Sequence, residues 1–323
     1  MQSFGHSLYL YTVNTMRHLL LLALLGWTLG CAGETYAVII SGGRNKMYNH
    51  ERYWNDCAFL YRTLRQDYHL PKEHITLLMA DGDNPANDML RDGAKGFASS
   101  PTDLDGDGEP DLMFAATRQN LDDTFNKLSI SLTSCDHLFV FITDHGERDA
   151  DGCVHLWLWD GETMNPGQLA ELMGQCRPAT MNILLGQCYA GAFVEELDKL
   201  NSLQGHIITA ACAASQLSWS CKDRPYDEFV YHWTCAVAQH DEQGLPVHSD
   251  TDGDGCVTMQ EAYYYARQHD RRPETPSLTA YPAAIARQWS FGREGIDNGI
   301  EAPPAEPFST ATSQVYDLQG RKR

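Results

Sequence analysis

The sequence predicts an α/β fold in which a mainly parallel sheet carries helices on both faces. Short apolar runs alternate along the chain with longer segments whose apolar residues recur at helical spacing, and this alternation is typical of parallel sheets covered by helices. The runs are nearly continuous rather than alternating with polar residues, as expected of strands buried on both faces. A length of 323 residues is enough for one large domain or two smaller ones.

The elements follow one another in a regular order. Core strands are predicted at residues 36–41, 74–79, 137–143, 181–186 and 206–210, and residues 153–159 are predicted as an added hairpin strand. Helices are predicted at residues 52–68, 119–130, 166–173, 193–200, 228–239 and 258–269. We therefore expect one domain over residues 34–300. Residues 301–323 are rich in Pro, Ala, Ser and Thr at first, which indicates a disordered linker.

The charge balance limits the function classes. The chain carries 43 acidic and 24 basic residues, a formal net charge of −19. Nucleic-acid binding is therefore not expected, because contact with phosphates needs a basic face. Part of the acidity lies in two short Asp clusters, which indicates cation binding instead.

Both ends of the chain carry features of an exported protein. Residues 1–33 are predicted to be a signal peptide, with the true start at Met1 or Met16 and an apolar core at 19–25 that is too short to span a bilayer. Cleavage after Ala32 would give a secreted protein, which we favour, whereas lipidation of Cys31 would give a cell-surface lipoprotein. The last nine residues, VYDLQGRKR, resemble the start of a C-terminal sorting signal read by export machinery; the alternative is a disordered basic end.

The ten cysteines show no CxxC pair, so neither a zinc ribbon nor a thioredoxin-like motif is supported. Cys57, Cys135 and Cys235 lie within apolar patterns and are predicted to be core residues. Disulfides are plausible in an oxidising compartment, and Cys212 with Cys221 is the first pair to consider.

Two predicted strands end in residues that carry chemistry. LFVFITDHGERD ends one strand in His145 and Gly146, and NILLGQCYAGAF ends another in Cys188. The carboxyl ends of parallel strands meet at one edge of the sheet, where such folds bind ligands. A thiol beside an imidazole is the arrangement of a nucleophile and its base. The backbone N–H groups of Gly146 and Cys188 could then form an oxyanion hole.

Three segments together resemble the legumain (asparaginyl endopeptidase) family of cysteine peptidases, within the caspase-like clan. They are YAVIISGGRNKMYNHERYWNDCAFLYRTL, FVFITDHGERD and NILLGQCYAGAF, and the likeness runs from about Tyr36 to about Trp233. It implies a caspase-like three-layer α/β/α sandwich. It also implies that Cys188 is the nucleophile, that His145 is its base and that Asn49 orients the histidine.

The specificity pocket departs from the family pattern. The family has Arg where this chain has Glu51, and Glu where this chain has Gly186. The region TAACAASQLSWSCKDRPYDEF matches the family's pocket loop loosely and offers Ser218 or Ser220 and Asp223 or Asp227 as pocket residues. An acidic pocket built from Glu51 and Asp227 would favour Arg or Lys in the substrate, because a buried carboxylate needs a charge partner.

Residues 250–261 have the ligand spacing of an EF-hand calcium loop. The side chains at positions 1, 3, 5, 9 and 12 would be Asp250, Asp252, Asp254, Thr258 and Glu261, and Cys256 would add its carbonyl at position 7. Thr258 and Glu261 also match a capping box that opens the next helix, and both interpretations can hold at once.

Residues 103–114 form a weaker calcium loop, in which position 12 is Phe114 and the bidentate Glu is missing. The ligands at positions 1, 3, 5 and 9 would be Asp103, Asp105, Asp107 and Asp111. The alternative is a solvated acidic turn. Ca²⁺ is the expected cofactor, and no organic cofactor is expected.

These features predict a secreted cysteine endopeptidase that cleaves peptide or protein substrates through a thioester acyl-enzyme. A peptide ligase or transpeptidase would use the same residues and differ only in whether an amine or water resolves the acyl-enzyme. A second class is a catalytically inactive, calcium-stabilised binding protein on a peptidase scaffold. The oligomeric state is left open by the sequence.

Overall fold

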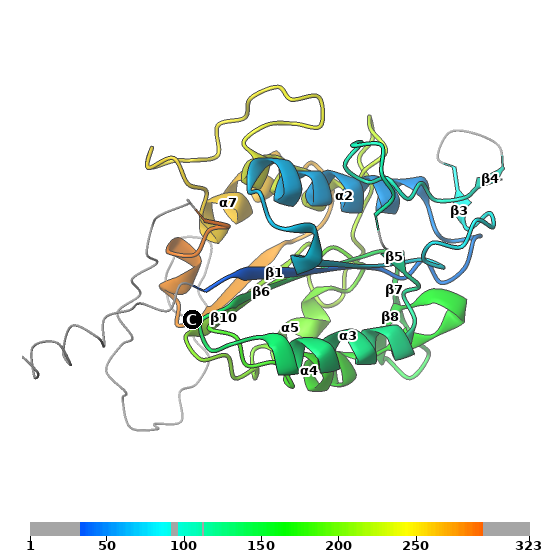
Figure 1. Cartoon of the computed structure of the whole chain (residues 1–323), viewed down its shortest axis with the longest axis horizontal. Helices are drawn as coiled ribbons and strands as arrows, with labels where there is room; N and C mark the ends of the chain where they lie inside the picture. Colours follow the sequence, from blue (N-terminus) through cyan, green and yellow to red (C-terminus); the bar gives the residue numbers. More distant parts are fainter. Residues whose placement is uncertain (1–32, 92–95, 112, 293–323) are drawn as a thin grey trace, which may run out of the picture.

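The computed structural model describes residues 33–91, 96–111 and 113–292 (Figure 1). Its centre is a seven-stranded sheet with the strand order β12-β11-β10-β6-β1-β2-β5. In chain order the strands are β1 (Thr35–Ser41), β2 (Ile75–Met79), β5 (Met113–Phe114), β6 (His137–Thr143), β10 (Thr180–Leu185), β11 (Gly205–Ala210) and β12 (Ser277–Tyr281). Every pairing is parallel except that of β11 with β12. This confirms the predicted fold class, a three-layer α/β/α sandwich.

Helices cover both faces of the sheet (Figure 1). They are α2 (Glu51–Arg62), which continues as a π-helical turn (Thr63–Asp67), α3 (Arg118–Ser131), α4 (Pro166–Met173), α5 (Gly191–Leu197), α6 (Glu228–Ala238) and α7 (Met259–His269). One hydrophobic cluster joins the sheet to α2, α6 and α7, and a second joins it to α3, α4 and α5. The near-continuous apolar runs of the central strands follow from this, because β1, β6, β10 and β11 face a helix layer on both sides.

Two small sheets lie outside the central one. β3 (Met89–Leu90) pairs with β4 (Phe97–Ala98), and β7 (Gly146–Arg148), β8 (Val154–Trp157) and β9 (Thr163–Met164) form an antiparallel sheet that begins directly after β6. The added strand predicted at 153–159 is β8. Short 3₁₀ turns lie at Lys72–His74, Trp159–Gly161 and Ile285–Arg287.

The register of the central strands brings three loops to one edge of the sheet. Ser41 at the end of β1 pairs with Thr143 at the end of β6, and Leu185 at the end of β10 pairs with Ile142. The segments that follow these three strands therefore leave the sheet side by side, which places the two predicted catalytic segments together.

The cysteines follow the predictions only in part. Cys57 and Cys235 are buried free thiols, as predicted. Cys135 is half-buried and disulfide-bonded rather than a core thiol. Cys212 and Cys221, the first pair to consider, are both free.

The predicted signal peptide and C-terminal tail lie outside the described residues, apart from Gly33. Among the residues that the structure describes, none of the helices combines the length and apolar character needed to cross a membrane.

Candidate active site

The loops after β6 and β10 pack against each other at Gly146 and Cys188. A Cβ atom added to Gly146 would lie 2.0 Å from the carbonyl oxygen of Cys188 and 2.9 Å from its carbonyl carbon. Only a residue without a side chain allows this approach. The glycine after His145 is therefore what permits the histidine segment to lie directly against the cysteine segment.

The imidazole of His145 is held by the segment between β1 and α2. Its Nε2 lies 3.0 Å from the carbonyl oxygen of Tyr48, and the hydroxyl of Tyr53 lies 3.4 Å from each ring nitrogen. A carbonyl oxygen can only accept a hydrogen bond, so Nε2 carries the proton of the neutral ring. The lone pair is then on Nδ1, which is the atom able to act as a base.

Asn49 lies in the same segment but is not the partner of His145. Its side chain is buried, and its Nδ2 donates to the carbonyl oxygen of Asp88 at 3.1 Å, with a carboxylate oxygen of Asp88 at 3.5 Å. The prediction that the Asn49 side chain orients the histidine is corrected: the main-chain carbonyl of the preceding residue, Tyr48, takes that position. Asn49 instead fixes the segment that presents this carbonyl.

Asp144 is a site residue that the sequence analysis missed. It is a non-glycine residue at φ 105° and is 3% exposed. Its carboxylate accepts hydrogen bonds from the N–H of Gly43 (2.5 Å), the hydroxyl of Ser41 (3.2 Å) and the N–H of His145 (2.6 Å). Burial raises its pKa to about 7, although these hydrogen bonds act in the opposite direction. Asp144 thus ties the end of β1 to the histidine loop, and its place directly before His145 was the available signal.

Burial sets the protonation of the cysteine and histidine. It lowers the pKa of His145 to about 4, and it raises the pKa of the Cys188 thiol. The thiol donates to the carbonyl oxygen of Ser218, with a distance of 3.6 Å from Sγ to oxygen. At neutral pH the free protein therefore holds a neutral thiol and a neutral imidazole rather than a thiolate–imidazolium pair.

Two N–H groups at the junction have no acceptor among the described residues. Gly146 faces Leu156 across the β7–β8 pair, while the N–H of Trp157 donates to the carbonyl of His145 at 3.0 Å. This is the pattern of a non-hydrogen-bonded antiparallel pair, so β8 does not use the N–H of Gly146. The N–H of Cys188 is also without an acceptor in the described part of the chain. Both groups are available to an oxyanion.

The predicted pocket residues do not form a simple acidic pocket. Asp227 is 5% exposed, and its carboxylate is 2.9 Å from Nε of Arg52, so its charge already has a partner. Glu51 is half-buried at the start of α2. Asp223 is exposed and pairs with Arg224 at 3.3 Å. Of the two acids in the predicted pocket, Asp227 is thus already paired with Arg52.

The two serines predicted for the pocket, Ser218 and Ser220, make different contacts. Ser218 contacts Cys188 through its carbonyl, whereas Ser220 forms an isolated β-bridge with Asp227. The Arg52–Asp227 pair, whose members are 175 positions apart, is a feature that local sequence patterns could not show.

The loop at 250–261 gathers three of its predicted ligands. Oxygen atoms of Asp250, Asp252 and Asp254 lie within 4.8 Å of one another. Glu261 is turned to other partners: one carboxylate oxygen accepts from Thr251, and the other accepts from the N–H and hydroxyl of Thr258 in a capping box. Cys256 donates its N–H to Asp254 at 2.7 Å. The capping box predicted for Thr258 and Glu261 is thus present, and calcium binding by this loop stays a prediction.

The loop at 103–114 is less suited to a cation. Asp103, Asp105 and Asp111 have oxygens within 4.8 Å of one another, and Asp107 is not part of this group. However, Asp111 is buried and forms an ion pair with Nζ of Lys72 at 2.7 Å. Part of the negative charge that would hold a metal is therefore already neutralised.

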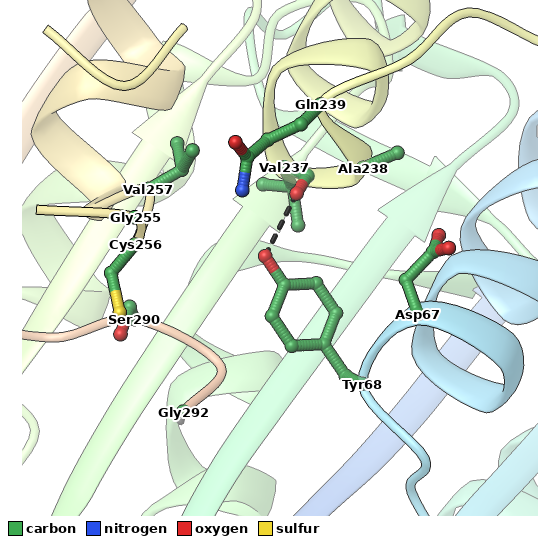
Figure 2. A pocket seen from close by; sticks show the side chains of 10 residues that line it. All are labelled: Asp67, Tyr68, Val237, Ala238, Gln239, Gly255, Cys256, Val257, Ser290 and Gly292. Atoms are coloured by element: carbon green, nitrogen blue, oxygen red, sulfur yellow. Dashed lines mark hydrogen bonds between the residues drawn. The ribbon is translucent and has the colours of Figure 1, made fainter. Parts of the chain in front are cut away.

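A cavity of about 200 Å³ lies away from Cys188, beside the loop at 250–261 (Figure 2). Its lining includes Tyr68, Gln239 and Cys256, and the hydroxyl of Tyr68 donates to the carbonyl of Val237 at 2.8 Å. None of the predicted catalytic residues lines it, so it is not the pocket of the candidate active site.

The comparison with protein-family models agrees with the resemblance of the motifs. The model of the peptidase C13 family matches residues 35–270. The match covers most of the chain, and the chain therefore belongs to the peptidase C13 family, the legumain family of cysteine peptidases. The curated proteins gave no match. Among solved structures the chain is similar to protein GSU0716 from Geobacter sulfurreducens, with 12% identity and a TM-score of 0.42 over 76% of this chain and 93% of that one.

Proposed function

We propose that the protein is a secreted cysteine endopeptidase that uses Cys188 as its nucleophile and His145 as its base. The observation that carries the proposal is the contact of Gly146 with the Cys188 carbonyl, which joins the histidine loop to the cysteine loop. The N–H groups of these two residues have no acceptor among the residues that the structure describes. Membership of a cysteine peptidase family supports the reaction class.

The reaction follows from the protonation of the site. Nδ1 of His145 takes the thiol proton while the sulfur attacks the scissile carbonyl, and the N–H groups of Gly146 and Cys188 stabilise the oxyanion. The imidazolium that forms keeps its Nε2–H on the Tyr48 carbonyl and gives the Nδ1 proton to the leaving amine. Water then hydrolyses the thioester, with the same nitrogen as base.

The dyad is tested with peptidyl acyloxymethylketone probes that differ in the P1 residue. We expect labelling of the mature protein under mild reduction, and its loss in both Cys188→Ala and His145→Ala. Labelling that survives in Cys188→Ala would refute the assignment of the nucleophile. A failure of every probe and every peptide library would favour a binding protein on a peptidase scaffold, and trapping of product by an added amine would identify a ligase.

We also propose that the cluster of Asp250, Asp252 and Asp254 binds Ca²⁺, because three carboxylates converge there and oxygen ligands at alternate positions suit this cation. Titration of the metal-free protein with Ca²⁺ should raise its Tm, and Asp250→Ala should remove this rise. Asp103→Ala is the matched control and should keep it, because the Lys72–Asp111 pair weakens the other loop. Equal effects of the two variants would contradict the assignment.

A further inference from the structure

A second group of polar side chains lies beside Cys188 and has no role in the proposed reaction. The carbonyl of Ser218 accepts the hydrogen bond of the thiol, and the N–H of the next residue, Trp219, donates to Oε2 of Glu274 at 3.1 Å. The carboxyl of Asp270, at the end of α7, acts on that of Glu274. A chain of contacts thus leads from the nucleophile to two neighbouring carboxyl groups.

The segment that carries Glu274 is fixed to the loop that carries Ser218. The side-chain oxygen of Gln216 accepts hydrogen bonds from the N–H of Ala213 (3.2 Å) and the N–H of Thr275 (2.9 Å). The guanidinium of Arg272 lies over the ring of Trp219, 5.0 Å from its centre. The two segments therefore form one wall next to Cys188, in which the carboxyl groups have defined positions.

Several oxygen atoms in this wall lack the partners that buried polar atoms normally have. The hydroxyl of Ser218, Oε1 of Glu274 and Oδ2 of Asp270 are buried and have no well-aligned hydrogen bond within the described structure, although the side chains of Ser218 and Asp270 lie close enough to Glu274 to act on its pKa. Asp227, the other acid that acts on the Cys188 thiol, already has Arg52 as partner. Nε of Arg272 is a buried donor of the same wall that also has no hydrogen-bond partner in the described structure, so no donor of the wall is well placed for the hydroxyl of Ser218, Oε1 of Glu274 or Oδ2 of Asp270.

We propose that Glu274, Asp270 and Ser218 form the pocket for the P1 side chain of the substrate and that this pocket selects lysine or arginine. The proposal rests on the peptidase function proposed above and names its substrate class. An ammonium or guanidinium group supplies several donors and a positive charge, whereas an asparagine side chain supplies two donors and no charge. Glu274 thus supplies the acidic charge that the sequence predicted for Glu51 and Asp227 in this pocket.

The protonation state of Glu274 in the free protein agrees with a pocket that binds a cation. Burial and the neighbouring Asp270 raise the pKa of Glu274 to about 9, with a smaller contribution from Asp227 in the same direction. Burial raises the pKa of Asp270 as well, although the N–H and the charge of Arg272 act in the opposite direction. In the free protein at neutral pH a proton therefore neutralises Glu274. A P1 cation replaces that proton, which passes to solvent, so binding of a basic side chain strengthens as the pH rises toward 9.

The test compares peptides that differ only at P1, with Lys, Arg or Asn, in the full-length mature protein and in Glu274→Gln. Gln keeps an oxygen for the N–H of Trp219 but cannot carry charge. We expect the variant to lose on the order of 30-fold or more in kcat/KM on the Lys and Arg peptides and to change less than about twofold on the Asn peptide. Glu171 is an exposed residue on α4. Glu171→Gln is therefore the matched control and should leave kcat/KM on all three peptides unchanged.

The outcomes separate this proposal from the peptidase function. Preference of the unaltered protein for Asn, or an equal loss on all peptides in Glu274→Gln, would overturn the pocket while cleavage that depends on Cys188 still stands. For the Lys peptide, kcat/KM should rise between pH 7 and 9 relative to the Asn peptide, and parallel profiles would also overturn the pocket. If no peptide is cut and no acyloxymethylketone probe labels Cys188, both proposals fail.

Discussion

Gly146→Ala is the substitution for which the structure gives the most direct expectation. The added Cβ would lie 2.0 Å from the carbonyl oxygen of Cys188, whereas ordinary contacts begin at 3.4 Å. Both nearest atoms belong to the backbone of the nucleophile loop, so no flexible side chain can turn away. The two loops would have to separate by about 1 Å or more, and a misplacement of this size costs on the order of 100-fold in rate.

The assay is kcat/KM on a fluorogenic peptide, together with Tm and the rate at which iodoacetamide alkylates Cys188. The backbone of Gly146 is not in the left-handed region, so the alanine variant should fold and remain open to alkylation. Gly167→Ala is the matched control, because its added Cβ meets only the side-chain oxygen of Asn165 at 3.5 Å. A Gly146→Ala variant with unaltered kcat/KM would refute the argument that the contact of the two loops builds the site.

Three further results follow from the same geometry. Burial lowers the pKa of His145 to about 4, so the neutral base is present above that pH and lost below it. The pH profile of kcat/KM should therefore fall on its acid side near pH 4, and a fall near the ordinary histidine pKa would contradict this. Tyr53→Phe removes the hydroxyl that lies 3.4 Å from both ring nitrogens of His145. It should lower kcat/KM about fivefold, as expected for the loss of one hydrogen bond of about 1 kcal/mol. An unchanged kcat/KM would contradict a positioning role of Tyr53. Asp144→Ala leaves the buried N–H of Gly43 and the hydroxyl of Ser41 without their acceptor. The expected loss of stability, about 1–3 kcal/mol, corresponds to a Tm lower by about 2–10 °C. An unchanged Tm would show that water replaces the carboxylate.

The elements that the sequence predicted best are those with a local signature. β1, β6 and β10 are continuous apolar runs, and the structure places each within one residue of its predicted bounds. β12 was missed because its residues are only half-buried and its apolar content is ordinary for a loop. It pairs antiparallel at the edge of the sheet, where a strand needs only one partner and carries little pattern of its own.

A local sequence signature also separates the site residues that were predicted from the one that was not. Cys188, His145 and Gly146 stand at the ends of predicted strands, and parallel pairing is enough to bring them to one edge. The acceptor for His145 is a main-chain carbonyl, that of Tyr48, and every residue type carries one. No residue pattern could therefore identify it, and the nearest distinctive side chain, Asn49, was assigned the role instead.

The neutral state of the dyad has a consequence for how the proposed reaction begins. Because burial opposes charge on both Cys188 and His145, transfer of the thiol proton creates two charges in a site that disfavours each of them. The transfer becomes favourable only together with attack, when the negative charge passes to the oxyanion and the imidazolium keeps the Tyr48 carbonyl as its acceptor. Without a scissile carbonyl to attack, the thiol should stay protonated. Iodoacetamide reacts by displacement of iodide at its methylene group and forms no oxyanion, so it should alkylate Cys188 slowly at pH 7, at no more than the rate of an exposed thiol such as Cys153. Rapid alkylation at pH 7 would instead require a thiolate and would contradict this order of events.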